Sequence, residues 1–375
     1  MRQRALQAVL LVHAIEQTDL AGDALSIEDR TQATREAIGS RPLPAGAPPR
    51  IDGSAERFLT LRADALLARL RVRSPGVDSV LAAASRSPGL DRVLLLLGFL
   101  VGVALAFADG RRIDIFAYPL IGLVIWNLIA YIVLIVRLFE SAPAHTPSGP
   151  VPGAASRLDA TAAHTSAWRD GFIRRSLAGL YANRVRARID ALIAHSIGFN
   201  APLAPGLRRF AADWWEVGRP LFRVRARRLL HVAAIFAAIG LMVGYAFRGW
   251  LLREPVGWRA TVLGPASAHA ALVTLYGAGS AVSGVPMVSI QGVQALAWTG
   301  PTSGGGPAGQ WLYLIDWTAL LYIVLPRLIA VILTTLSLWR RAATLPTPST
   351  FCGYLAALLR SATPAAAPPP AALDG

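Results

Sequence analysis

The sequence predicts an all-α, polytopic membrane protein with about four transmembrane helices and helical cytoplasmic regions. First, 54% of the 375 residues are hydrophobic and only 16% are charged, whereas soluble domains carry about 25% charged residues. Second, the apolar residues gather in four runs near the ~20 residues that a helix needs to cross a bilayer. Third, the arginines concentrate in segments that one topology places on a single side. One such run can be a buried helix of a soluble protein, but four with charged flanks favour a membrane.

The first two runs form a predicted antiparallel hairpin. They are Val93–Ala108, which is short, and Ile115–Val136, and the polar residues 109–114 join them. The third run is Leu229–Phe247. The fourth begins at Trp311 and continues to about Leu336.

The distribution of arginine predicts the orientation of these spans. Residues 137–228 contain fifteen arginines and six acids, whereas residues 248–310 contain three arginines and one acid. Both termini and the central segment are therefore expected on the cytoplasmic side of the membrane. The predicted regions are an N-terminal helical domain at 1–89, a transmembrane hairpin at 90–137, a basic cytoplasmic helical loop at 138–228, a third span at 229–248, an extracytoplasmic loop with an interfacial helix at 249–310, a fourth span at 311–339 and a cytoplasmic, partly disordered tail at 340–375.

Hydrophobic spacing and capping residues predict helices outside the spans. One helix covers 4–18, a second starts after Ser26, and a third covers 54–73. Residues 166–196 read as a basic amphipathic helix, which either lies on the membrane surface or packs on the N-terminal domain. Residues 265–284 are too polar and glycine-rich for a good span, so an interfacial or a re-entrant helix is expected.

Five arginines immediately precede the third run, and they are predicted to anchor the chain at the membrane surface. Each contributes about 1 kcal/mol against anionic lipid. Nucleic-acid binding is not expected, because the aromatic residues are not spaced as a base-stacking platform. The five are Arg219, Arg223, Arg225, Arg227 and Arg228.

Three polar residues within the predicted spans are candidates for function, because a polar group in a bilayer needs a partner. Asn127 is expected to hydrogen-bond across the bundle. Asp316 and Arg327 are about three helical turns apart, too far to pair. Either they mark the outer and inner edges of the fourth span, or they form a polar track with Asn127.

Two glycine pairs have the spacing of close helix packing. Gly98 and Gly102 lie in the first run, and Gly240 and Gly244 lie in the third. The first and third spans are therefore expected to pack through them, unless the glycines simply reflect an arginine-, alanine- and glycine-rich composition.

Several kinds of chemistry are not expected from these residue types. All 37 basic residues are arginine, so no lysine is present for a phosphate-binding loop of the Walker type. The single cysteine, Cys352, cannot form an internal disulfide. The six histidines show no metal-binding spacing, and no acid–base pair stands out. The sequence therefore predicts a protein that is not an enzyme and needs no cofactor.

Seven segments form recognisable motifs. They are LLVHAIEQTD from Leu10, FLTLRADALLARL from Phe58, YPLIGLVIWNLIAYIVLI from Tyr118, RARRLLHVAAIFAAIGLMVGYAFRGW from Arg225, GWRATVL from Gly257, PASAHAAL from Pro265 and WLYLIDWTALLYIVLPRL from Trp311. Together they resemble the proteobacterial inner-membrane family catalogued as domain of unknown function 2868 over most of residues 5–335. The family has no established activity. Its members are commonly encoded beside a predicted GTPase, so the resemblance implies a cytoplasmic GTPase as partner.

Two functions from different classes remain open. The first is a non-enzymatic membrane scaffold or anchor whose cytoplasmic residues bind a partner. The second is a small transporter or channel that uses Asn127, Asp316 and Arg327. Four spans are few for a monomeric transporter, so this second function requires a homo-oligomer. A membrane enzyme ranks third, because no acid–base pair is visible.

Overall fold

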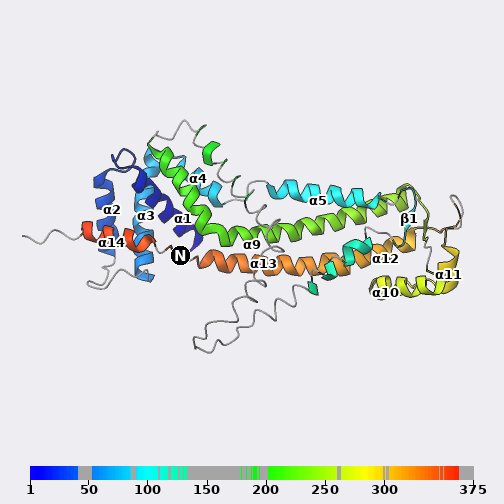
Figure 1. Ribbon diagram of the computed structural model, residues 1–375. Helices are drawn as coiled ribbons and strands as arrows, with labels where there is room; N and C mark the ends of the chain where they lie inside the picture. Colours follow the sequence, from blue (N-terminus) through cyan, green and yellow to red (C-terminus); the bar gives the residue numbers. More distant parts are fainter. Residues whose placement is uncertain are drawn as a thin grey trace, which may run out of the picture. The chain divides into compact units, whose positions relative to one another are not determined.

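The computed structural model describes residues 1–40, 53–85, 90–108, 110–116, 120–125, 127–129, 131–132, 202–259, 263–298, 304–345, 347–348 and 350–362, with residues 179, 183, 187, 189–191, 194 and 300. The described chain is almost entirely helical, as predicted (Figure 1). It divides into two compact units. Unit 1 comprises residues 1–88, 172–225 and 336–375, and unit 2 comprises residues 89–171 and 226–335.

Unit 1 is a helical domain with a continuous apolar core. Its helices are α1 (Gln3–Thr18), α2 (Ile27–Ser40), α3 (Gly53–Arg73), α4 (Val77–Ser85), the N-terminal part of α9 (Leu203–Ala246) and α14 (Thr350–Ala362). Leu11, Leu66 and Phe210 lie at its centre with no exposed surface. Burial of such side chains stabilises each by about 1.5–3 kcal/mol. The three chain segments therefore fold as one domain.

The start of α2 has the predicted cap. The hydroxyl Oγ of Ser26 accepts a hydrogen bond from the N–H of Asp29 at 3.1 Å, and the N–H of Ser26 donates back to Asp29 Oδ2 at 3.3 Å. This reciprocal pair satisfies donors that the first helical turn leaves free. Asp19 fixes the preceding loop, because its carboxylate accepts from the N–H groups of Asp23, Ala24 and Leu25.

Part of the predicted tail at residues 340–375 is helical. α14 is an amphipathic helix whose Phe351, Leu355 and Leu358 belong to the core of unit 1. These apolar residues recur at helical spacing, so the segment is part of the domain. The proline-rich residues 363–375 lie outside the described residues.

The predicted boundary at residue 228 lies close to the division between the two units at residues 225 and 226, although no helix ends there. α9 is a single helix of 44 residues that includes Pro220 and continues without interruption through the basic cluster into unit 2. Arginine has a good helix propensity, so the change from basic to apolar side chains does not end the helix. The predicted amphipathic helix at 166–196 falls almost entirely outside the described residues.

Unit 2 is built around four long helical segments. They are α5 (Leu90–Ala106), a helix over the described residues of 120–132, the C-terminal part of α9, and a continuous helix of α12 (Gly309–Ala319), the π-helical η2 (Leu320–Val324) and α13 (Leu325–Ala343). Only the first part of α13 belongs to this unit. Two further helices, α10 (Pro265–Ser283) and α11 (Ile290–Ala295), lie between α9 and α12 in the sequence, and α10 packs on α12.

α5 lies parallel to α9, and the predicted glycine pairs form the contact (Figure 1). A Cβ atom on Gly98 would lie 2.7 Å from the carbonyl oxygen of Ala233, and one on Gly102 would collide with the carbonyl of Ala237. Gly240 and Gly244 face α5 in the same way, against Phe99 and against Ala106 and Val103. Small residues allow the two backbones to touch, which is how helices pack where lipid surrounds them.

A buried arginine holds the ends of α5 and α9 together. Arg248 lies in the π-helical η1 (Phe247–Leu251) and has no exposed surface. Its guanidinium pairs with Glu254 at 2.6 Å and donates to the carbonyl groups of Ala106, Gly110 and Arg112. Beside it, β1 (Ile113–Asp114) and β2 (Val256–Gly257) form a short parallel pair. The predicted turn at 109–114 is therefore tied to the segment that follows α9.

Two helices in the described part of the chain are long and apolar enough to cross a membrane. They are Leu203–Leu251 and Gly309–Ala343. α5 has 17 residues, and the apolar helix Leu120–Ile129 is shorter. Helix length alone thus identifies two spans where the sequence predicts four.

Candidate functional site

A polar cluster connects three helices of unit 2. Arg327 of α13 donates from Nε to Asn127 Oδ1 at 2.8 Å, and its Nη1 lies 3.1 Å from His231 Nδ1 of α9. The hydroxyl of Tyr131 donates to Asn127 Oδ1 at 3.3 Å, and the Arg327 guanidinium lies 5.9 Å from the centre of the Tyr131 ring. We call these four residues the Arg327 cluster.

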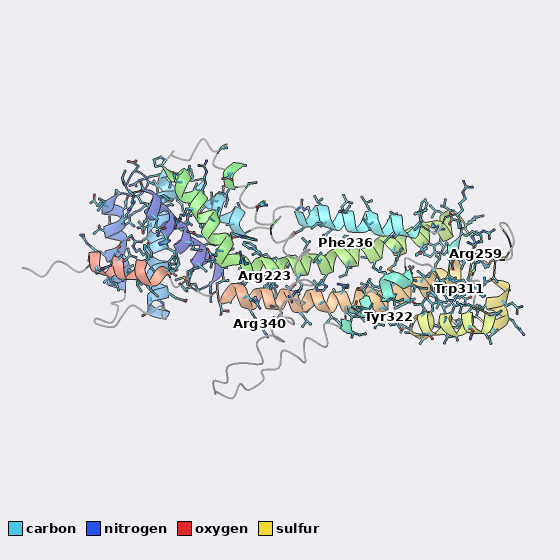
Figure 2. All side chains as sticks on the ribbon, viewed as in Figure 1. Arg223, Phe236, Arg259, Trp311, Tyr322 and Arg340 are labelled. Atoms are coloured by element: carbon cyan, nitrogen blue, oxygen red, sulfur yellow. The ribbon has the colours of Figure 1, made fainter. Side chains whose placement is uncertain are left out.

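The local backbone explains why Tyr131 joins this cluster. Pro326 has no N–H, so the carbonyl of Tyr322, four residues earlier, lacks its α-helical donor. The hydroxyl oxygen of Tyr131 lies 3.2 Å from that carbonyl, so its one proton is shared between this carbonyl and Asn127 Oδ1. The π-helical turn η2 lies at the same place, and π-bulges are frequent at functional sites. Figure 2 labels Tyr322 in this turn and Trp311 earlier on the same helix.

The charge of Arg327 is solvated here by neutral groups. Asn127 contributes an amide oxygen, and His231 contributes a ring nitrogen that accepts only in the neutral imidazole. Asn127 is itself oriented by a hydrogen bond from its Nδ2 to the carbonyl of Leu123 at 2.7 Å. Within the described residues, no carboxylate lies within ion-pair distance of Arg327. The cluster therefore holds a positive charge among neutral groups, which is an arrangement that favours the binding of an anion.

An apolar cavity of about 460 Å³ adjoins the cluster. Tyr131 belongs to both, since its ring lines the cavity and its hydroxyl binds Asn127. Apolar side chains line most of the cavity, and Ile125 and Leu128 are about half exposed. The lining residues are Phe116, Ile121, Val124, Ile125, Leu128 and Tyr131 with Ala271, Thr274, Leu275 and Tyr322.

The predicted polar residues do not all meet. Asn127 and Arg327 are in direct contact, whereas Asp316 joins neither of them through a hydrogen bond found among the described residues. The Asp316 carboxylate is partly enclosed, and its Oδ1 has no hydrogen-bond partner in the described part of the chain. Two residues of the cluster were not predicted from the sequence, namely Tyr131 and, on α9, His231. The position of His231 one turn after the basic cluster was the available signal.

The five arginines of the predicted anchor lie on α9. Arg219, Arg223 and Arg227 are exposed at intervals of one helical turn, and Arg225 and Arg228 are half-buried. Arg225 contacts Gln3 Oε1 at 3.4 Å and lies over the Phe222 ring. Three of the five therefore present charge outward, as an anchor requires.

Unit 1 contains a second, buried polar cluster that the sequence did not predict. Arg62 of α3 pairs with Glu16 of α1 at 2.6 Å and donates to the hydroxyl of Tyr354 of α14 at 2.7 Å. Tyr354 in turn donates to Glu16. Burial opposes the charge on Arg62, but Tyr354 and Glu16 outweigh it and raise its pKa, and burial raises the pKa of Tyr354 well above its usual value.

A cavity of about 570 Å³ opens beside this second cluster. Glu16, Arg62 and Tyr354 line it together with Arg30, Thr34 and Arg35 of α2. Arg30 is paired with Asp19 at 2.8 Å, and Arg35 is exposed. Among the residues that the structure describes, no group of three or more histidine, cysteine or acidic side chains is arranged to hold a metal ion.

Comparisons with protein-family models, with curated proteins and with solved structures find no match for this chain. The resemblance to the inner-membrane family therefore stays a prediction, and the argument for function depends on the residues themselves.

Proposed function

We propose that this protein is a non-enzymatic anchor of the bacterial inner membrane, with unit 2 in the bilayer and unit 1 as a cytoplasmic platform for a partner. The observation that carries the proposal is the contrast between the surface of unit 1 and the surface of unit 2. Unit 1 buries apolar side chains such as Leu11, Leu66 and Phe210 in one continuous core. Unit 2 exposes apolar side chains in continuous helical faces, which on a soluble protein would mark an interaction surface far larger than usual.

These exposed faces are found on three helices of unit 2. On α5, Val93, Leu97 and Leu100 are each more than half exposed, and on α13 Ile332 and Leu333 are each 58% exposed. The third face, on α9 and the start of η1, includes Phe236, Ile239, Val243 and Phe247. A bilayer stabilises such surface as a protein interior would, so lipid is the environment that fits unit 2.

The packing within unit 2 supports four crossings. α5 lies parallel to α9, from Gly98 beside Ala233 to Ala106 beside Gly244. If this part of α9 crosses the bilayer, the helix that lies against it for the same length crosses as well. The turn with Arg112 then lies beside Arg248 on the outer side.

The remaining two crossings return in the opposite direction. The segment after β1 runs from the strand pair to Asn127, which meets Arg327 beside His231 on α9. The fourth helix runs from Leu312, which faces Gly249, to the same Arg327. Both segments thus retrace α9 and end at the Arg327 cluster, which leaves both termini on the cytoplasmic side.

The cavity lining favours a re-entrant α10 over an interfacial one. Ala271 and Thr274 of its N-terminal half line the same cavity as Leu128 and Tyr322. Tyr322 lies about 16 Å along the helix from Trp311 at 1.5 Å per residue, which is close to half of the ~30 Å hydrocarbon thickness. α10 therefore starts at depth and leads outward.

Unit 1 suits a platform because the helices that enter the membrane are part of its fold. α9 and α13 each contribute to both units, and α14 closes the core after the fourth span. A folded domain attached at two points holds a partner close to the bilayer. The resemblance described above implies a GTPase as that partner, and the cavity beside Arg35 is a concave surface of unit 1 where it could bind.

Crosslinking in native membranes tests the platform. Full-length tagged protein is crosslinked, purified and assayed for bound guanine nucleotide. We expect a GTP-binding protein with the wild type and with Arg57→Glu, whose exposed arginine lies outside the cavity lining, and a loss of at least about fivefold with Arg35→Glu. Recovery without guanine nucleotide, or equal recovery with both variants, contradicts the proposal.

A small oligomeric transporter or channel is the second candidate, and the observation that favours it is the Oδ1 of Asp316, which has no hydrogen-bond partner among the residues that the structure describes. Ion flux in liposomes distinguishes the two. A flux that Asp316→Asn and Arg327→Leu both abolish establishes transport, whereas liposomes without flux beyond the protein-free background leave the anchor as the function.

A further inference from the structure

We propose that the Arg327 cluster and the adjoining apolar cavity form a binding site for one anionic phospholipid, with its phosphate at Arg327 and an acyl chain in the cavity. This inference depends on the proposed membrane placement of unit 2, and it goes beyond the platform function. Two observations in the same unit carry it, namely a cation with no carboxylate partner among the described residues and the cavity that it adjoins.

The charge at Arg327 selects the head group. Its neighbours Asn127 and His231 accept through an amide oxygen and a ring nitrogen, and the ion pairs found among the described residues do not include Arg327. A cation in a bilayer is costly unless it is paired. A guanidinium has five N–H donors in a planar fork, and two of its nitrogens are engaged here, so donors remain for phosphate oxygens.

The shape and polarity of the cavity favour an acyl chain as its occupant. About 460 Å³ of space is lined almost wholly by carbon atoms of Ile125, Leu128 and Leu275 and of their neighbours. A free inorganic anion would gain nothing from such a wall, whereas each buried methylene contributes about 0.8 kcal/mol. Tyr131 connects the two parts, since its ring lines the cavity and lies under the guanidinium.

The depth of the site fits a lipid of the cytoplasmic leaflet. His231 precedes Arg248 by about 25 Å along α9 at 1.5 Å per residue. With Arg248 at the outer end of the bundle, the Arg327 cluster lies near the opposite boundary of a hydrocarbon layer of ~30 Å. The phosphates of that leaflet lie at this level, and the cavity extends from it toward the middle of the bilayer.

Native mass spectrometry of the full chain in mild detergent tests the site. The added probes are dioleoyl phosphatidylglycerol, dioleoyl phosphatidylcholine and oleic acid. The wild type is expected to retain one phosphatidylglycerol at least about fivefold more than phosphatidylcholine, as one charge contact at a membrane surface supplies. Arg327→Gln should reduce retention to the phosphatidylcholine level, and Arg327→Lys should restore part of it.

A second pair of variants keeps the Arg327 cluster intact. Leu128→Trp fills the cavity at a position that is 54% exposed, and Leu333→Trp places the same side chain at a 58% exposed position outside the lining. Retention should fall with the first and stay unchanged with the second.

Three outcomes overturn the inference. Equal retention of the two phospholipids removes the head-group contact, and equal retention by the two tryptophan variants removes the cavity. Displacement of phosphatidylglycerol by oleic acid shows a fatty-acid site instead of a phospholipid site. A chain that stays monodisperse without detergent contradicts the membrane placement itself, so the two failures are distinct.

Discussion

Arg327 and Asn127, 200 residues apart in the sequence, are joined by a 2.8 Å hydrogen bond between the guanidinium and the amide oxygen. The contact links the helix that begins at Gly309 to the helical segment at 120–132, and His231 adds α9. Three of the four long segments of unit 2 thus meet at one cation.

This contact predicts an energetic coupling that a double-mutant cycle measures. Asn127→Leu, Arg327→Leu and the double variant are unfolded by detergent titration in mixed micelles. The two changes should be non-additive by about 0.6–1.7 kcal/mol, the range for hydrogen bonds between membrane helices. Asn127→Leu combined with Asp316→Leu serves as the control and should be additive, because no hydrogen bond joins them. Additivity in both cycles contradicts the cluster.

Because α5 and α9 approach closely, the loss of stability caused by one added methyl group should depend strongly on its position. Gly102→Ala places a Cβ against the backbone of Ala237 and Leu241, which cannot move without separating the helices. We expect a loss of at least about 3 kcal/mol of unfolding free energy, the upper range for overpacking. Gly122→Ala is the matched control, since nothing lies within 4 Å of its Cβ. Similar stabilities of the two variants would show that α5 does not lie against α9.

The Arg62–Glu16–Tyr354 cluster predicts that α14 is released when its charge balance is broken. Arg62→Met leaves the Glu16 carboxylate buried without its cation, which costs about 3–5 kcal/mol. Tyr354→Phe removes one hydroxyl and costs about 1 kcal/mol. Cys352 of α14 is the only cysteine and is half-buried, so its reaction rate with a maleimide reports the release. The rate should rise in the order wild type, Tyr354→Phe, Arg62→Met. An unchanged rate with Arg62→Met would show that the ion pair does not hold α14.

The environment of His13 predicts a pH dependence of unit 1. Burial lowers the pKa of His13 below 6.5, and its ring contacts Phe351 and Tyr354 of α14. The folded state therefore prefers the neutral imidazole. The contribution of the neutral His13 to the free energy of unfolding is fully present above about pH 6.5. It is lost as the pH falls through the pKa of His13 in the folded state.

Thermal unfolding between pH 7.5 and pH 5 measures this contribution. The midpoint of the wild type should fall over that interval, and His13→Gln should reduce the fall. The Asp19 carboxylate affects stability in a different pH range. Burial alone would raise its pKa, but the N–H groups of Leu25 and Ala24 and the charge of Arg30 outweigh this and lower it, so its contribution is lost only below about pH 4. An identical slope for both proteins between pH 7.5 and pH 5 excludes His13 as the titrating group.

Local patterns predicted the elements of the fold well. The helix after Ser26, the helix that ends at Arg73 and the apolar runs of α9 and α12–α13 follow from capping and hydrophobic spacing, because these signals depend on neighbours in the sequence. The glycine spacing likewise indicated where helices approach, since only a missing side chain permits backbone contact.

Long-range contacts could not be predicted in this way. α14 belongs to the core of unit 1 because Phe351 contacts His13, more than 300 positions earlier in the sequence. A pattern of neighbouring residues cannot predict so distant a partner. Arg62 and Glu16 each look like ordinary charges on helix surfaces until α14 covers them. The place of His231 in the Arg327 cluster could not be predicted for the same reason, since its partner is on another helix.

The most direct test of the account is the sidedness of three single cysteines in membrane vesicles. In a Cys352→Ala background, Val72→Cys probes unit 1, Arg111→Cys probes the turn after α5, and Gln291→Cys probes α11; all three positions are exposed. A membrane-impermeant maleimide should label Arg111→Cys and Gln291→Cys only in right-side-out vesicles, and Val72→Cys only in inverted ones. Labelling of Arg111→Cys from the same side as Val72→Cys would contradict a crossing by α5 and with it the four-span arrangement.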